Sequence, residues 1–291
     1  MKNARTNDSF TKDPLTIDSI IKPPVTRGSS TSKISLAQDK IYGGSLILVN
    51  ASCRFRGKND DLLIPVHDSA PDILLNRRAA ILLSQLMEEI DGWRHIVPVS
   101  GWRSQEEQQA IWDDTVKESG LEFTRKYVAV PGHSEHQTGL AIDLGLKQEH
   151  IDFICPEFPY TGICQTFRDR AAKYGFILRY PAGKEHITGI GHEPWHFRYV
   201  GIPHAEIMAA NGLTLEEYTD LLTRYPYGDK PYRHISGGRD IYVSYIRAAE
   251  GETVLDLPES LPYSLSGNNR DGYILTEWRT ENAYQNQLRR A

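Results

Sequence analysis

The chain has 291 residues and a formal net charge of −5, from 33 Lys and Arg against 38 Asp and Glu. Its 40% hydrophobic and 24% charged residues are typical of a globular protein and exclude a collagen, a coiled coil and a disordered chain. The mild acidity argues against a nucleic-acid-binding protein, so no nucleic-acid partner is expected. No apolar run approaches the ~18 residues that a membrane-spanning helix needs. The three cysteines are too few for a disulfide framework, and the sequence leaves open whether Cys155 and Cys164 pair.

Residues 1–40 differ in composition from the rest of the chain. They are rich in Ser and Thr, contain few large apolar side chains, and are predicted to be a flexible tail or linker. They also lack the apolar stretch of a signal peptide. Two locations stay open: the cytoplasm, or the cell surface with a membrane anchor that this chain does not include. The basic, Ser/Thr-rich stalk favours the second, and membrane association is then expected only through that anchor.

Residues 41–225 are predicted to form the main folded domain. Apolar periodicity predicts a helix from Pro71 to Gly92, and a capping box at Ser104 begins another helix that ends near Glu118. Further helices are expected at 165–174, at 203–210 and from a second capping box at Thr214. Short apolar or β-branched runs predict strands at 45–50, 96–99, 140–144, 176–180 and 195–200.

The pattern changes to alternating strands in the last part of the chain. Strands are expected at 239–247, 252–257 and 273–278, so residues 226–291 are predicted to be a small β-rich appendix. The predicted fold class is therefore α+β, with a central, mostly antiparallel sheet, flanking helices and this appendix.

Six of the ten histidines fall within residues 133–196. One group of them ends in the string HEPWH, which matches the H-E-x-x-H pattern of helical zinc sites. That interpretation is rejected, because Pro194 disfavours helical geometry at Glu193 and residues 197–200 continue as a strand. His192 and His196 then need not converge on one metal. Glu193 and His196 remain as candidate site residues, close to the start of a predicted strand.

A metal centre is predicted from His136, Asp143 and His196. A zinc hydrolase uses three protein ligands and keeps a fourth position for water, whose pKa the metal lowers to about 7. A turn at Gly139 is expected to bring Asp143, on the following strand, back toward His136. Glu193 is then the candidate general base, which takes the proton of the water and passes it to the leaving amine.

These segments together resemble the zinc D,D-peptidases of the VanY/VanX/VanXY group. Residues 134–143 (SEHQTGLAID) resemble their S-x-H-x-x-G-x-A-x-D motif, and residues 193–196 (EPWH) resemble their Glu and Trp-His motif. Residues 100–108 (SGWRSQEEQ) are similar to their S-G-Y-R-S-x-x-x-Q segment, with Trp102 in place of Tyr. The string EPWHFRYVG is close to VanY-type carboxypeptidases. The resemblance covers about 41–225 and extends weakly into the appendix.

The resemblance implies the hedgehog and D-Ala-D-Ala metallopeptidase fold and a role for each motif residue. It implies one Zn²⁺ per chain on the three predicted ligands, Glu193 as the base, and Arg103 as the cation that stabilises the oxyanion. A fixed guanidinium aimed at developing negative charge suits that role. The candidates for binding the terminal carboxylate of the substrate are Ser104, Gln108 and Ser134. Trp195 is expected to pack beneath the metal, and His192 to line or support the pocket.

The activity implied is that of a zinc-dependent D,D-carboxypeptidase. It removes the terminal D-Ala from peptidoglycan precursor stem peptides ending in D-Ala-D-Ala, which contributes to vancomycin resistance. Open alternatives are a D-Ala-D-Ala dipeptidase or bifunctional D,D-peptidase, an L,D-endopeptidase of the same fold, and a non-catalytic zinc module that binds cell wall or a protein partner. Glu193 and Arg103 argue against the last, because a binding module needs no general base.

Overall fold

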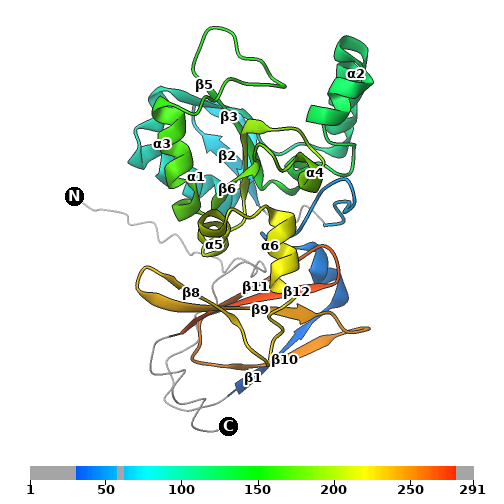
Figure 1. Ribbon diagram of the computed structural model, residues 1–291, viewed down its shortest axis with the longest axis vertical. Coiled ribbons are helices and arrows are strands. Elements are labelled where there is room, and N and C mark those ends of the chain that lie inside the picture. Colours follow the sequence, from blue (N-terminus) through cyan, green and yellow to red (C-terminus); the bar gives the residue numbers. More distant parts are fainter. Residues whose placement is uncertain (1–30, 58–61, 280–291) are drawn as a thin grey trace, which may run out of the picture.

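The computed structural model describes residues 31–57 and 62–279, and Figure 1 shows it as two packed parts. The upper part combines helices with a four-stranded sheet, and the lower part consists mainly of strands. This arrangement of antiparallel sheets and helices confirms the predicted α+β class. Residues 1–30 of the predicted tail and 280–291 of the predicted appendix lie outside the described residues.

The central sheet of the upper part has the strand order β4-β5-β7-β6 and is antiparallel throughout. Its strands are β4 (Ile96–Ser100), β5 (Ala141–Leu146), β6 (Phe176–Tyr180) and β7 (Glu193–Tyr199). Each lies within two residues of a predicted strand, because apolar and β-branched runs are typical of strands in a buried sheet. A separate hairpin is formed by β2 (Leu63–His67) and β3 (Ala70–Asn76).

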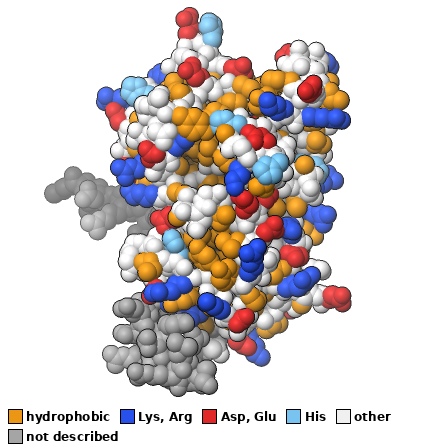
Figure 2. Space-filling model, viewed as in Figure 1, with side chains coloured by type: hydrophobic (Ala, Val, Ile, Leu, Met, Phe, Trp, Pro, Cys, Tyr) orange, Lys and Arg blue, Asp and Glu red, His pale blue; other side chains and the backbone are white. Residues whose placement is uncertain are grey.

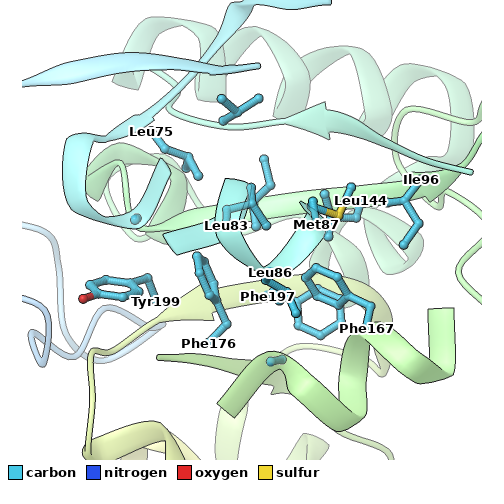
Figure 3. Close-up of a cluster of buried hydrophobic side chains, with 14 of the residues drawn as sticks. Leu75, Leu83, Leu86, Met87, Ile96, Leu144, Phe167, Phe176, Phe197 and Tyr199 are labelled. Atoms are coloured by element: carbon cyan, nitrogen blue, oxygen red, sulfur yellow. The ribbon is translucent and has the colours of Figure 1, made fainter. Parts of the chain in front are cut away.

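Alternation along these strands gives the sheet one apolar and one polar face. The apolar face packs against helices α1 (Arg77–Glu89) and α3 (Gly162–Ala171), and its buried side chains are shown in Figure 3. They include Leu83 and Leu86 of α1 and Ile142, Leu144, Phe167, Phe176 and Phe197. The intervening residues of the strands carry acids, imidazoles and guanidinium groups, among them Asp143, Arg179, His196 and Arg198. The polar face is therefore where a functional site can form.

Helix α1 begins later than predicted. Asn76 caps it, since its side-chain oxygen accepts hydrogen bonds from the backbone N–H groups of Arg78 and Ala79. The prediction of a start at Pro71 was wrong, because residues 70–76 pair with β2 as a strand. The apolar residues at 73–75 are compatible with a helix and with a strand. Pairing with β2 makes this segment a strand.

Helix α2 (Gln105–Tyr127) begins at the predicted capping box. Ser104 Oγ accepts from the Glu107 N–H, and the Glu107 carboxylate accepts from the Ser104 N–H. The helix passes the predicted end near Glu118, because Gly120, with φ of 81°, interrupts it and a second helical segment follows. A short helix α4 (Glu185–Thr188) precedes β7.

Residues 45–49 are buried, but residues 45–50 do not form the predicted strand. Their backbone groups are bound mainly by side chains and loops. Arg198 Nη2 donates to the Ser45 and Ile47 carbonyls, at 2.9 and 2.8 Å. From the lower part, Ser266 Oγ accepts from the Leu46 N–H at 2.9 Å. The apolar run predicts burial correctly, but its hydrogen bonds come from side chains instead of a neighbouring strand.

The lower part contains a four-stranded antiparallel sheet of order β11-β12-β9-β8. Its strands are β8 (Tyr232–Ser236), β9 (Arg239–Arg247), β11 (Tyr263–Gly267) and β12 (Gly272–Arg279). A second pair joins β10 (Thr253–Pro258) to β1 (Thr31–Leu36). The prediction of a tail was wrong for residues 31–36, because Ile34 and Leu36 pack against the apolar core of this part.

Helices α5 (His204–Asn211) and α6 (Leu215–Leu222) lie between the two parts. The predicted capping box at Thr214 begins α6. His204 connects the parts through two hydrogen bonds, Nδ1 with the Tyr218 hydroxyl at 2.8 Å and Nε2 with the Thr276 hydroxyl at 3.1 Å. Among the described residues no helix combines the length and apolar character needed to cross a membrane.

Candidate active site

Three buried side chains meet on the polar face of the central sheet. Asp143 of β5 and His196 of β7 are directly opposed in the ladder, and His136 lies on a short helical turn, Glu135–Thr138, just before β5. Asp143 Oδ2 lies 3.1 Å from His136 Nε2, and Asp143 Oδ1 lies 2.9 Å from His196 Nδ1. One ligand atom from each residue lies within 4.8 Å of the others, and no other such group occurs within the described residues.

Gly139 produces the turn that brings the predicted ligands together. It ends the helical turn in the left-handed region, with φ of 70°, and a Cβ at this position would lie 2.7 Å from Leu63 Cδ2. A residue other than glycine would therefore meet both backbone strain and a steric clash. The sequence prediction that this turn returns Asp143 toward His136 agrees with the geometry.

The donor set fits a divalent cation. Burial would raise the pKa of Asp143, but His136 and His196 hold it well below its usual range. Burial lowers the pKa of His136, which favours the neutral imidazole that a metal requires. Burial would also lower the pKa of His196, but Asp143 and Glu135 raise it to about 9, so a cation must displace a proton from this ring. Asp143 Oδ1 is buried and makes no hydrogen bond of good geometry among the described residues, although His196 Nδ1 lies 2.9 Å away, as expected of two atoms that serve one metal.

Glu193 begins β7 and faces the same group. Its Oε2 lies 3.7 Å from His196 Nδ1, and the side chain is buried. Burial raises the pKa of Glu193 to about 8, although the nearby His196 opposes the shift. A carboxyl group with a raised pKa beside a metal site has the properties of a general base that later returns its proton.

Arg103 is held in a fixed orientation over the pocket. Nη1 donates to Gln108 Oε1 and Nη2 donates to Ser100 Oγ, both at 2.7 Å. Gln108 is 1% exposed and also donates through Nε2 to the Ala129 carbonyl, so its helix face is buried. The Phe153 ring lies 5.8 Å from the guanidinium carbon. The remaining guanidinium N–H groups can therefore address a substrate without reorienting the side chain.

Eight of the predicted site residues line a single pocket. They are Arg103, Gln108, Ser134, His136, Asp143, Glu193, Trp195 and His196. Apolar walls are provided by Tyr127, Val128, Phe153, Ile154, Tyr180 and Ile190. Trp195 also belongs to the apolar core. On the face shown in Figure 2, positive and negative side chains are interspersed around apolar ones.

Two predicted site residues do not line this pocket. Ser104 serves as the cap of α2, so its predicted contact with substrate has no support in this geometry. His192 Nε2 pairs with the Tyr160 hydroxyl at 2.7 Å and takes no part in the metal group. The rejection of a helical H-E-x-x-H site is confirmed, because Glu193 and His196 lie on a strand.

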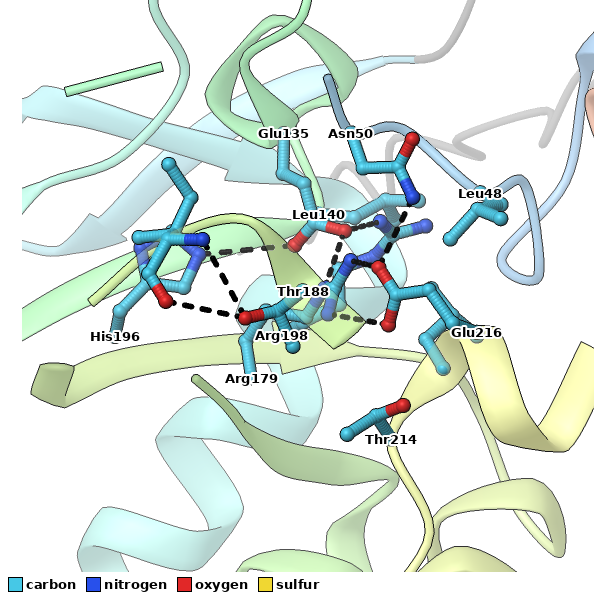
Figure 4. Close-up of polar contacts among 12 residues, drawn as sticks. Leu48, Asn50, Glu135, Leu140, Arg179, Thr188, His196, Arg198, Thr214 and Glu216 are labelled. Atoms are coloured by element: carbon cyan, nitrogen blue, oxygen red, sulfur yellow. Dashed lines mark hydrogen bonds and ion pairs between the residues drawn. The ribbon is translucent and has the colours of Figure 1, made fainter. Parts of the chain in front are cut away.

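The sequence prediction missed a buried ion network next to the metal group (Figure 4). Glu135 Oε1 accepts from Arg179 Nε at 2.8 Å and from Arg198 Nη1 at 2.7 Å. Glu216 of α6 accepts twice from Arg179, at 3.0 and 2.6 Å. The available signal was an arginine inside each of two apolar strand patterns, FILRY and WHFRY, since an arginine is rarely buried without a partner.

Residues 72–202 match the family model described as VanY, D-alanyl-D-alanine carboxypeptidase. A curated relative is the bifunctional D-Ala-D-Ala dipeptidase and D-Ala-D-Ala carboxypeptidase VanXYC of Enterococcus gallinarum. It is 46% identical over 164 residues, which make up 56% of this chain and 85% of that protein. The chain belongs to the VanY family. The family predicted from the motifs is thereby confirmed.

Solved structures extend the similarity of this VanY-family chain beyond its catalytic part. The vancomycin resistance D,D-dipeptidase VanXYg, in complex with a D-Ala-D-Ala phosphinate analog, is 50% identical with a TM-score of 0.84. The match covers 86% of this chain and 99% of that chain. The D,D-pentapeptidase VanY from a VanB-type resistance cassette, in complex with Zn(II), is 34% identical with a TM-score of 0.51. That match covers 60% of this chain and 98% of that one.

Proposed function

We propose that this VanY-family protein is a zinc-dependent D,D-carboxypeptidase. It removes the terminal D-Ala from peptidoglycan precursor peptides that end in D-Ala-D-Ala, and it contributes in this way to vancomycin resistance. The observation that carries the proposal is one buried pocket that contains a His, Asp and His metal group, a carboxyl group and an oriented guanidinium. The names of VanXYC and of the Zn(II)-containing VanY support the substrate class and the metal.

The residues of the pocket divide the work of hydrolysis. His136, Asp143 and His196 would hold a zinc ion, which would supply a Lewis acid and a water of lowered pKa. The Glu193 carboxylate accepts a proton from the attacking water and delivers it to the nitrogen of the departing D-Ala. Arg103 stabilises the negative charge that develops on the carbonyl oxygen of the scissile bond. It does so at little reorganisation cost, because Gln108 and Ser100 already fix its orientation.

Glu193→Gln tests this assignment. The variant keeps the shape of the side chain but accepts no proton, so we expect kcat on a stem pentapeptide to fall about 10²- to 10⁴-fold. Zinc content, measured by atomic absorption, is expected to stay at the wild-type level. Glu149→Gln is the matched control, because Glu149 is exposed on the loop after β5 and does not line the pocket. Full activity of Glu193→Gln with zinc bound would contradict the mechanism.

A second candidate function is that of a bifunctional D,D-peptidase, which also cleaves free D-Ala-D-Ala. The similarity that favours it is the match to the D,D-dipeptidase VanXYg along nearly the whole of that chain. Rates on a stem pentapeptide and on the free dipeptide, each with a chelated control, distinguish the two functions. Mass spectrometry of the products separates both from an L,D-endopeptidase, since loss of one alanine differs from a cut after L-Ala.

We also propose a location at the cell surface, with the cytoplasm as the alternative. The cell-wall substrate and the composition of residues 1–40 support it. Fractionation of cells that express the full-length gene, with activity measured in the membrane, wall and soluble fractions, tests the choice. Activity confined to the soluble cytoplasmic fraction would refute the surface location.

A further inference from the structure

Glu135 is a fully buried carboxylate to which the proposed reaction gives no role. One oxygen, Oε1, accepts from both Arg179 and Arg198. The other, Oε2, faces His196 Nε2 at 3.7 Å (Figure 4). Both of these facing atoms are buried, and neither has a hydrogen-bond partner within the described part of the chain. An unpartnered buried oxygen and an unpartnered buried nitrogen therefore point at each other directly behind a predicted metal ligand.

The two ring nitrogens of His196 face different groups. Nδ1 lies beside Asp143, on the side of the metal group, while Nε2 lies beside Glu135. A neutral imidazole carries its proton on one nitrogen and a lone pair on the other. A carboxylate next to Nε2 favours the proton there, which leaves the lone pair of Nδ1 for a metal.

His136 shows the same arrangement with a different acceptor. Its Nε2 faces Asp143, and its Nδ1 lies 2.6 Å from the Gly101 carbonyl. Each histidine thus presents one nitrogen to the metal group and the other to an oxygen. The 3.7 Å gap at His196 is longer than the ~3 Å of a hydrogen bond, so the two atoms must come closer for the proton to be shared.

The need to neutralise the charges of Arg179 and Arg198 does not by itself explain why Glu135 lies beside His196. Arg179 and Arg198 are matched in number by Glu135 and Glu216, and all four belong to one buried network. Glu216 completes that balance from α6 without facing a metal ligand. Of these two glutamates, Glu135 is the one whose second oxygen, Oε2, faces a predicted metal ligand.

We propose that Glu135 is a positioning residue for the metal centre. Its Oε2 accepts the Nε2 proton of His196, which fixes the tautomer and the ring orientation in which Nδ1 addresses the metal. The proposal rests on the proposed function for the identity of the metal, but it concerns metal affinity and not hydrolysis. An outer carboxylate of this kind typically strengthens metal binding 10- to 100-fold.

The test compares Glu135→Gln with Glu216→Gln in the full chain. Both substitutions remove one negative charge from the same network, but only the first replaces an acceptor facing His196 with an amide. Competition with a chelator measures the dissociation constant for Zn²⁺. We expect Glu135→Gln to weaken zinc binding about 10- to 100-fold. We expect Glu216→Gln to stay within about twofold of the wild type, since it touches no ligand. Equal effects of the two variants, or no effect of Glu135→Gln, would overturn the proposal.

A measurement on the wild type covers the case in which Glu135→Gln does not fold. Long-range ¹H–¹⁵N NMR of the zinc-loaded protein, labelled on its histidines, reports the tautomer of His196. We expect a proton on Nε2 that exchanges slowly with water, and a rapidly exchanging proton there contradicts the role of Glu135. Zinc binding that depends on Glu135 without hydrolysis of the pentapeptide would refute the proposed function and leave this inference standing. A wild type that binds no zinc would overturn both.

Discussion

Replacing His204 by Gln is expected to change how stability depends on pH. The imidazole is buried between the Tyr218 and Thr276 hydroxyls at the junction of the two parts. Burial lowers its pKa to about 3, with smaller contributions from His234 and Arg78. The folded protein therefore keeps this ring neutral at a pH where the unfolded chain is already protonated.

The magnitude follows from the two pKa values of the ring. In the unfolded chain a histidine has a pKa of about 6.5. The contribution to stability is fully present above this pH, and it is lost progressively as the pH falls from 6.5 toward 3, because only the unfolded state gains the proton. Linkage gives a loss of about 2 kcal/mol between pH 7.5 and pH 5 from this one group.

Urea unfolding, followed by tryptophan fluorescence at both pH values, measures this loss. A chelator is included in all samples, so that release of metal does not contribute. Other groups titrate equally in the wild type and in His204→Gln, so the difference between their pH-dependent losses isolates His204. We expect the wild type to lose about 2 kcal/mol more, and the exposed His150→Gln variant to follow the wild type. Identical losses in the wild type and His204→Gln would refute the reasoning.

Two further substitutions address the pocket and the core. Arg103→Lys is expected to lower kcat on the stem pentapeptide about 10²- to 10³-fold at unchanged zinc content, because an ammonium cannot bond Gln108 and Ser100 together while it faces the substrate. Steady-state kinetics check this, and a loss confined to KM would indicate ground-state binding instead. Leu83→Ala removes a fully buried side chain of α1 and is expected to cost about 2 to 5 kcal/mol in urea unfolding. A cost far below this range would show that the core closes around the missing side chain.

The group of His136, Asp143 and His196 could be predicted because its residues belong to two short sequence motifs. His136 and Asp143 are separated by one turn at Gly139, and Glu193 and His196 lie within one strand. The positions within each pair therefore depend little on the rest of the fold, whereas the pairing of β5 with β7 brings the two pairs together. Gln108 is a partial exception, because its contact with Arg103 needs only one helical turn, whereas its burial depends on the distant Ala129.

The ion network behind the metal group could not be predicted in the same way. Glu135, Arg179, Arg198 and Glu216 come from four separate elements and meet only after the strands have paired. A charged residue in isolation is most often solvated. The burial of such a residue can be inferred only once the tertiary structure places its oppositely charged partners nearby.

Two segments show the same limit for the fold. Residues 45–50 have the composition of a strand, yet they receive hydrogen bonds from Arg198 and from loops. Residues 31–36 have the composition of a tail, yet they pair with β10. The pattern of apolar residues indicates which side chains are buried, but the tertiary structure determines which groups hydrogen-bond to the backbone of the segment.

The segment 45–50 also links the two parts of the structure. Two of its carbonyl groups accept from Arg198 of the central sheet, while Ser266 and Asn268 of the lower part accept from two of its N–H groups. Loss of the last three strands would leave half of these backbone groups without partners. The backbone of this segment therefore depends on a sheet that lies about two hundred residues further along the chain.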